Sequence, residues 1–106
     1  MRKEYPVDRA KITRPPTHPG VVLAEVMQTL LSRRTIDEIA QLLGVSRQTL
    51  HRVMAGDSAI SADMALRLGK LCGNGPELWM NMQAGYDVWE AKQRLGKRIA
   101  KIPTLR

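Results

Sequence analysis

The sequence is poor in cysteine, and this limits both its covalent and its metal chemistry. Cys72 is the single cysteine among 106 residues, so the chain cannot form an internal disulfide. It also has no second thiolate with which to build a zinc site. A chain without disulfides is typical of a reducing compartment, and we therefore expect a cytoplasmic location.

Long apolar stretches are also missing. No run approaches the roughly 18 consecutive apolar residues that indicate a membrane-spanning helix. The first residues do not have the apolar centre of a signal peptide. We therefore expect a soluble protein that is not exported and that has no membrane partner.

Groups suited to catalysis or to cofactor binding are scarce. His18 and His51 are the two histidines, and neither has a Cys, Asp or Glu at metal-ligand spacing. No glycine-rich phosphate loop follows a strand pattern. We expect no enzyme activity, no metal and no cofactor. His18 is interpreted as a turn or cap residue, and His51 as an exposed residue that can face DNA.

Positive charge is what the chain has in excess, and it lies at the two ends. The net charge is +7. Residues 1–17 contain five basic and two acidic residues, and residues 90–106 contain six basic residues and one acidic residue. Residues 18–89, with six basic and seven acidic residues, are nearly neutral. Such a balance suggests a polyanionic partner. We predict a basic, proline-rich extended arm over 1–17, a folded domain over 18–91 and a basic tail over 92–106.

The centre of the folded domain has the pattern of two short helices joined by a tight turn. Thr35 can cap the first helix while Glu38 bonds back to its amide, which is the capping-box pattern. Gly44 can take the left-handed conformation that ends this helix, and Ser46 can cap the next. Apolar residues recur at helical spacing at Ile39, Leu42, Leu43, Leu50 and Val53.

The outer face of the second helix is rich in hydrogen-bond donors and has no acid. Its residues are Arg47, Gln48, His51 and Arg52. The joint spacing resembles the helix-turn-helix of bacterial repressors, whose second helix enters the DNA major groove. A plain helical hairpin within a core is the alternative. It is disfavoured because a solvated face usually mixes both signs of charge.

Three more helices are expected around this pair, which makes the fold class all-α. From Val21 to about Leu31, apolar residues repeat at three and four, which predicts a helix that covers the pair. Ser61 is expected to cap a fourth helix with Cys72 on its buried face, and Pro76 to begin a fifth. The total is five helices.

The fifth helix carries an aromatic stripe, formed by Trp79, Tyr86 and Trp89. Aromatic stripes at helical spacing are usually core, and this is the favoured interpretation for Trp79. For Trp89, which lies near the basic tail, burial and a partner or dimer surface are equally favoured. All three residues are candidates for a dimer or partner interface.

Beyond residue 91, apolar residues recur among lysines and arginines at Leu95, Ile99 and Ile102. The pattern predicts a continued basic amphipathic helix that stops at Pro103 and forms on a partner or on nucleic acid. RNA is an open alternative, although no aromatic stacking platform accompanies the tail.

Four segments together resemble the HigA-type antitoxins, also called VapI-type, within the Xre-type, lambda-repressor-like helix-turn-helix regulators. They are THPG, LLGVSRQTLHRVMAG, ISADMALRLGKL and GPELWMNMQAGYDVWEA. The resemblance covers residues 17–91, and ELWMNMQAGYDVW is its more specific part. It implies a homodimer that binds a palindromic operator in double-stranded DNA. A small ribonuclease toxin, held inactive by the antitoxin, is a possible second partner.

The resemblance also implies roles for particular residues. The caps Thr35 and Ser46 match positions near DNA phosphates. Arg33 and Arg34 follow the first helix, and they are either further phosphate contacts or charges that favour the helix end. The base-facing positions are Arg47, Gln48, Thr49, His51 and Arg52.

Two departures from the family pattern are expected to weaken the grip on phosphate. Ile36 and Asp37 stand where the family often has Gln after the first cap, and Asp57 and Ser58 stand where it often has Lys or Arg. Phosphate contacts supply much of the affinity for DNA, so the affinity should depend on dimerisation and on the basic ends. Two alternatives are a stand-alone regulator without a toxin and a protein-interaction module with weak DNA binding.

Overall fold

The structure, a computed structural model, describes residues 16–105, so most of the predicted arm lies outside the described residues. Its elements are α1 (Pro19–Leu30), α2 (Ile36–Leu43), α3 (Arg47–Met54), α4 (Ala62–Cys72), α5 (Pro76–Leu95) and the 3-10 helix η2 (Gly96–Lys101). Within these residues there is no strand. The predicted all-α fold with five α-helices is confirmed.

The helices begin where the sequence supplies a cap. His18 caps α1, because its Nδ1 accepts the Gly20 N–H at 2.9 Å. Ser61 caps α4 by accepting the Met64 N–H at 3.1 Å. Pro76 begins α5, where its missing N–H leaves no hydrogen bond unmade. The prediction that His18 is a turn or cap residue is confirmed.

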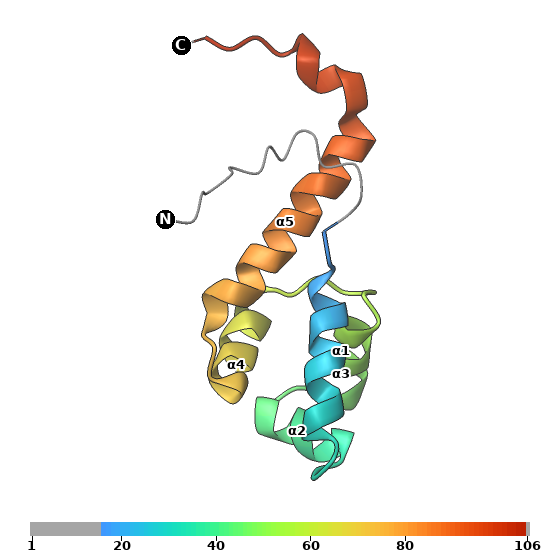
Figure 1. The fold of residues 1–106 in the computed structure, drawn as a ribbon, viewed down its shortest axis with the longest axis vertical. Coiled ribbons are helices and arrows are strands. Elements are labelled where there is room, and N and C mark those ends of the chain that lie inside the picture. Colours follow the sequence, from blue (N-terminus) through green and yellow to red (C-terminus); the bar gives the residue numbers. More distant parts are fainter. Residues whose placement is uncertain (1–15, 106) are drawn as a thin grey trace, which may run out of the picture.

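The hydrophobic core receives side chains from all five α-helices. Figure 1 shows α1 and α3 side by side, α2 across their end, and α4 against the first turns of α5. The buried apolar residues are Leu23, Met27, Ile39, Ala40, Leu43, Leu50, Val53, Ile60, Met64, Ala65, Leu68 and Trp79. The two helices of the predicted reading unit are thus held against the other three by one continuous core.

Helix α5 extends well beyond this core. Trp79 is its one residue in the apolar core, and the later turns rise away from the other helices (Figure 1). The helix continues to Leu95, past residue 91 where the sequence suggests that the domain ends. Gln83 is the last buried residue of α5, and the residues from Ala84 to Leu95 are all exposed or half-buried.

The predicted continuation of this helix to Pro103 is wrong. Gly96 has φ 54° and ψ −129°, and the chain then forms the 3-10 helix η2 instead of further α-helical turns. A positive φ is accessible to glycine because it has no Cβ, so Gly96 allows the break. The apolar side chains beyond it stay on the surface, with Ile99 48% and Ile102 66% exposed.

In the part of the chain that the structure describes, no helix has the length and apolar character needed to cross a membrane.

Candidate nucleic-acid interface

The unit α2–turn–α3 is built by the local interactions that the sequence predicts. The Glu38 N–H donates to Thr35 Oγ1 at 3.2 Å, and the Thr35 N–H donates to Glu38 Oε1 at 3.0 Å. Gly44 ends α2 with φ 75°, and Ser46 caps α3 by accepting the Thr49 N–H at 3.0 Å. The capping box, the left-handed glycine and the second cap are confirmed.

The capping box also affects the acidity of its carboxylate. The Thr35 backbone N–H, then the Thr35 hydroxyl, and to a smaller extent the Arg34 charge, hold the pKa of Glu38 below its ordinary value. These groups favour the ionised form because they donate to it or attract it. The first turn of α2 is therefore negatively charged at neutral pH.

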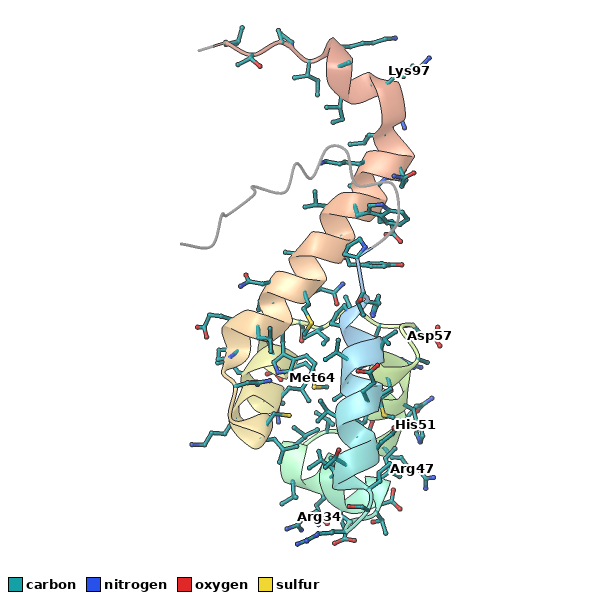
Figure 2. All side chains as sticks on the ribbon, viewed as in Figure 1. Arg34, Arg47, His51, Asp57, Met64 and Lys97 are labelled. Carbon is teal, nitrogen blue, oxygen red and sulfur yellow. The ribbon has the colours of Figure 1, made fainter. Side chains whose placement is uncertain are left out.

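The predicted base-facing residues form one exposed surface on α3. Leu50 and Val53 point inward and are buried, whereas the five candidates are all exposed: Arg47, Gln48, Thr49, His51 and Arg52. Figure 2 shows Arg47 and His51 projecting from the same side of α3, away from the core. The helix thus presents its donors to a partner while its apolar side fixes it in place.

Arg47 makes two contacts across this surface. Its Nε donates to His51 Nε2 at 3.4 Å, one turn along α3. A terminal guanidinium nitrogen lies 3.6 Å from Asp37 Oδ1 on the first turn of α2. The sequence suggests Asp37 only as a group that repels phosphate, so this ion pair is a feature that the sequence pattern did not reveal.

The candidate phosphate contacts border the same unit. Arg33 and Arg34 are exposed in the turn before α2, and Figure 2 places Arg34 at the end of the molecule beyond Arg47. Thr35 and Ser46 stand at the N-termini of α2 and α3, where the helix dipole favours an anion. At α2 the carboxylates of Asp37 and Glu38 oppose this attraction, whereas the first turn of α3 has no acid. All four candidates remain proposed contacts.

Arg67, on α4, supports the turn, and the sequence pattern does not indicate this role. Its Nη1 donates to the Leu43 carbonyl at 2.7 Å and to the Gly44 carbonyl at 3.3 Å, and its Nε pairs with Asp63. The guanidinium thus satisfies carbonyls at the end of α2 that have no partner within that helix. The four-residue spacing of Asp63 and Arg67 predicts their ion pair. It does not predict the contact of Arg67 with Leu43, which is 24 residues away in the sequence.

The three candidate interface aromatics have different surroundings. Trp79 is 0% exposed and its indole N–H donates to Asn74 Oδ1 at 3.1 Å, so its assignment to an interface is wrong and the core interpretation is correct. Tyr86 packs edge-to-face on the His18 ring, with the centroids 4.7 Å apart. Trp89 is half-buried, and its indole nitrogen is itself buried, with no hydrogen-bond partner among the described residues. Tyr86 and Trp89 remain candidates for a partner surface.

A groove of about 390 Å³ runs along α5 beside Trp89. It is lined by Pro16, Asn81, Ala84, Gly85, Val88, Trp89 and Lys92. Its residues on α5 recur at three and four, so they lie on one face of the helix. The middle of this face has the small side chains of Ala84 and Gly85, and its far end has the basic side chain of Lys92.

The possible metal ligands and the Cys72 thiol are the remaining groups with reactive chemistry among the described residues. There, no three His, Cys, Asp or Glu side chains lie close enough together to hold a metal ion. Burial raises the pKa of the Cys72 thiol above its ordinary value, so the reactive thiolate is disfavoured. Cys72 is half-buried against the core, in agreement with a packing role.

A capped helix, a left-handed turn and a second capped helix with a donor-rich outer face define a helix-turn-helix protein. The family described as a helix-turn-helix domain matches residues 20–79. A relative named an uncharacterised HTH-type transcriptional regulator, from Haemophilus influenzae, is 34% identical over 93 residues, with 86% of each chain covered.

Two solved structures resemble this fold over most of its length. An addiction module antidote protein of the HigA family from Coxiella burnetii is 35% identical, with a TM-score of 0.77 and coverage of 88% of this chain and 100% of that one. The Pseudomonas aeruginosa antitoxin HigA, solved with the higBA promoter, is 33% identical, with a TM-score of 0.75 and coverage of 86% and 99%. The chain belongs to the Xre-type helix-turn-helix family, in the group that contains the HigA-type antitoxins. This is a family of DNA-binding regulators and not a known family of enzymes.

Proposed function

We propose that this protein is a sequence-specific, DNA-binding transcriptional regulator of the HigA type, which reads double-stranded operator DNA with α3. The observation that carries the proposal is the exposed, acid-free donor surface of α3, held rigidly by the buried Leu50 and Val53. The Pseudomonas aeruginosa relative solved with its promoter supports the same role.

The side chains on this surface suit base edges in the major groove. Arg47 and Gln48 occupy the first turn of α3, the part of a recognition helix that meets bases. An arginine pairs bidentately with guanine and a glutamine with adenine, and each such pair is worth roughly 1–3 kcal/mol of discrimination. Thr49, His51 and Arg52 complete the surface, while Arg33, Arg34, Thr35 and Ser46 are assigned to phosphates.

A palindromic operator requires two copies of α3, and we assign the dimer contact to α5. Val88 is 53% exposed on this helix, and it lines the same groove as Trp89. An exposed apolar side chain such as Val88 is removed from water when a second surface covers it, and half-buried aromatic rings such as Trp89 are common at such contacts. Tyr86 links this surface to α1 through His18, which caps that helix.

Neutralisation of a small toxin is the second part of the proposal, and it rests on the HigA-type relatives. The proposed role is cytoplasmic and requires no enzyme activity, metal or cofactor. A stand-alone regulator would bind DNA equally well without a toxin. Co-expression with the product of a neighbouring short reading frame, followed by co-purification, distinguishes these two roles.

A protein-interaction module with weak DNA binding is the rival function. It is favoured by the apolar residues that α5 and η2 leave exposed, Val88, Ile99 and Ile102. Loss of a bound partner in Trp89→Ala but not in Arg47→Ala would support the rival. The direct test of the proposal is the affinity of the purified protein for DNA upstream of its own gene and for a random duplex of equal length. A clear preference at moderate salt supports it, and equal affinity refutes it.

A further inference from the structure

The acidic group nearest the reading surface lies against its first arginine. Asp37 Oδ1 is 3.6 Å from a terminal nitrogen of Arg47, and on the other side Arg47 Nε donates to His51 Nε2 at 3.4 Å. One guanidinium is therefore held from two directions, by the first turn of α2 and by the next turn of α3. The two contacts favour one direction of the planar group on a side chain that is otherwise flexible.

Orientation matters more for arginine than for a simple point charge. Bidentate pairing with a base requires both the position and the plane of the guanidinium to be correct. Arginine has five N–H donors, so contacts with Asp37 and His51 leave others free for a base edge. The ion pair is exposed, with 59% of the Arg47 and 67% of the Asp37 side chain accessible, and it is weak in water. When DNA covers the surface and displaces water, the attraction becomes stronger.

Asp37 also has an effect that does not depend on the DNA sequence. Its carboxylate repels nearby phosphates, and by holding Arg47 it opposes the swing of that side chain to a phosphate. On non-cognate DNA, an unrestrained Arg47 would add a phosphate contact of the kind that dominates non-specific binding. On cognate DNA, the restrained Arg47 reaches its base already oriented.

We propose that Asp37 is a specificity-determining residue that positions Arg47 for its base and keeps it from the phosphates of other sequences. The proposal rests on the proposed function, because it assumes that α3 reads DNA. Asp37 itself is a positioning residue and needs no contact with the DNA. Its negative charge lowers the affinity for every DNA sequence, while its contact with Arg47 increases the preference for cognate over non-cognate sites.

Asp57 provides a matched control. It is a second exposed acid of the helix-turn-helix, but Figure 2 places it beyond the opposite end of α3, with His51 between it and Arg47. Asp57→Asn therefore removes one negative charge without releasing Arg47. Asp37→Asn removes the same charge and releases it.

The test measures affinity for upstream DNA and for a random duplex in five proteins: the wild type, Asp37→Asn, Asp57→Asn, Arg47→Ala and the double variant Asp37→Asn/Arg47→Ala. We expect Asp37→Asn to bind random DNA more tightly and to lower the preference for upstream DNA about threefold to tenfold, as when two coupled contacting residues are separated. Asp57→Asn should tighten both complexes equally. In the Arg47→Ala background, Asp37→Asn should leave the preference unchanged. Unchanged thermal melting of each variant shows that its fold is intact.

The failures of this proposal and of the proposed function differ. If the wild type shows its preference and Asp37→Asn keeps it in full, Asp37 is only a repulsive charge and the inference is overturned alone. If Asp37→Asn still lowers the preference in the absence of Arg47, the effect does not pass through Arg47 and the inference is again overturned. A wild-type protein without any preference overturns the proposed function, and the inference with it.

Discussion

The side-chain carbonyl of Gln83 accepts the backbone N–H of Ile60 at 2.8 Å in the interior of the domain, which joins α5 to the loop that follows α3. Gln83 is only 4% exposed, and its Nε2 donates to Asp87 Oδ1 at 2.9 Å. The bond spans 23 residues of sequence. It sets the position of the reading unit relative to the helix to which we assign the dimer contact.

Removal of this amide should destabilise the whole domain. Gln83→Met keeps the length of the side chain but leaves the buried Ile60 N–H without an acceptor, which costs about 1–3 kcal/mol. Each kcal/mol lowers the melting temperature of a domain of this size by about 4–8 °C. Thermal melting followed by circular dichroism checks this. Gln93→Met, at an exposed position of the same helix, should melt like the wild type. Equal melting of the two variants would contradict the assignment.

The capping box predicts a particular dependence of stability on pH. The folded-state pKa of Glu38 is lowered, so its stabilising contribution is complete above the ordinary glutamate pKa of about 4.3 and is lost as the pH falls below that value. Glu38→Gln preserves the hydrogen bonds of the box but cannot titrate. We expect the wild type to melt above Glu38→Gln at pH 7 and level with it near pH 3. A difference that persists undiminished in acid would show that the carboxylate charge is not responsible.

Arg67 should stabilise the turn of the reading unit from outside it. Arg67→Met retains most of the packing of the stem but removes the donor to the Leu43 and Gly44 carbonyls, a loss of about 1 kcal/mol. We expect faster hydrogen exchange of the Val45 amide, because the turn opens more often. Lys70→Met, an exposed change on the same helix, is the control. Unchanged exchange in Arg67→Met would mean that the turn is stable without α4.

The basic end of the chain should contribute affinity without sequence preference. Removal of residues 97–106 leaves α5 intact and eliminates Lys97, Arg98, Lys101 and Arg106. If these cations contact phosphates, the slope of log affinity against log salt should decrease by up to about 0.9 for each contact. Affinity for upstream and random DNA should fall by the same factor. An unchanged affinity and slope would confine DNA binding to residues 1–96.

The local features of this fold could be predicted from the sequence because they depend on neighbouring residues. Thr35 with Glu38, Gly44 and Ser46 act within a few positions of one another, so their spacing alone indicates where helices start and stop. The exposed face of α3 follows from the same reasoning, since inward Leu50 and Val53 determine what points outward. Helical periodicity therefore predicted both the reading unit and its surface.

Features that depend on distant contacts could not be predicted in the same way. The bond between Arg67 and Leu43 requires knowledge of how α4 packs on α2. The aromatic stripe correctly favoured a buried Trp79, but it left open whether Trp89 is buried. The ion pair between Asp37 and Arg47 crosses two helices whose angle the sequence does not give. The apolar pattern continues past Gly96 at helical spacing, but the α-helix ends there because glycine can adopt a positive φ.

The most direct test of the account is the effect of Arg47→Ala on the preference for upstream DNA, compared with Arg94→Ala. Both variants remove one exposed positive charge, but Arg47 lies on the reading surface and Arg94 on the last turn of α5. Titrations at several salt concentrations should show that Arg47→Ala reduces the preference about tenfold, as expected for the loss of one bidentate pair. Arg94→Ala should weaken binding to all DNA by one common factor or not at all. A full preference in Arg47→Ala, or an equal loss in both variants, would contradict the claim that α3 reads the DNA sequence through Arg47.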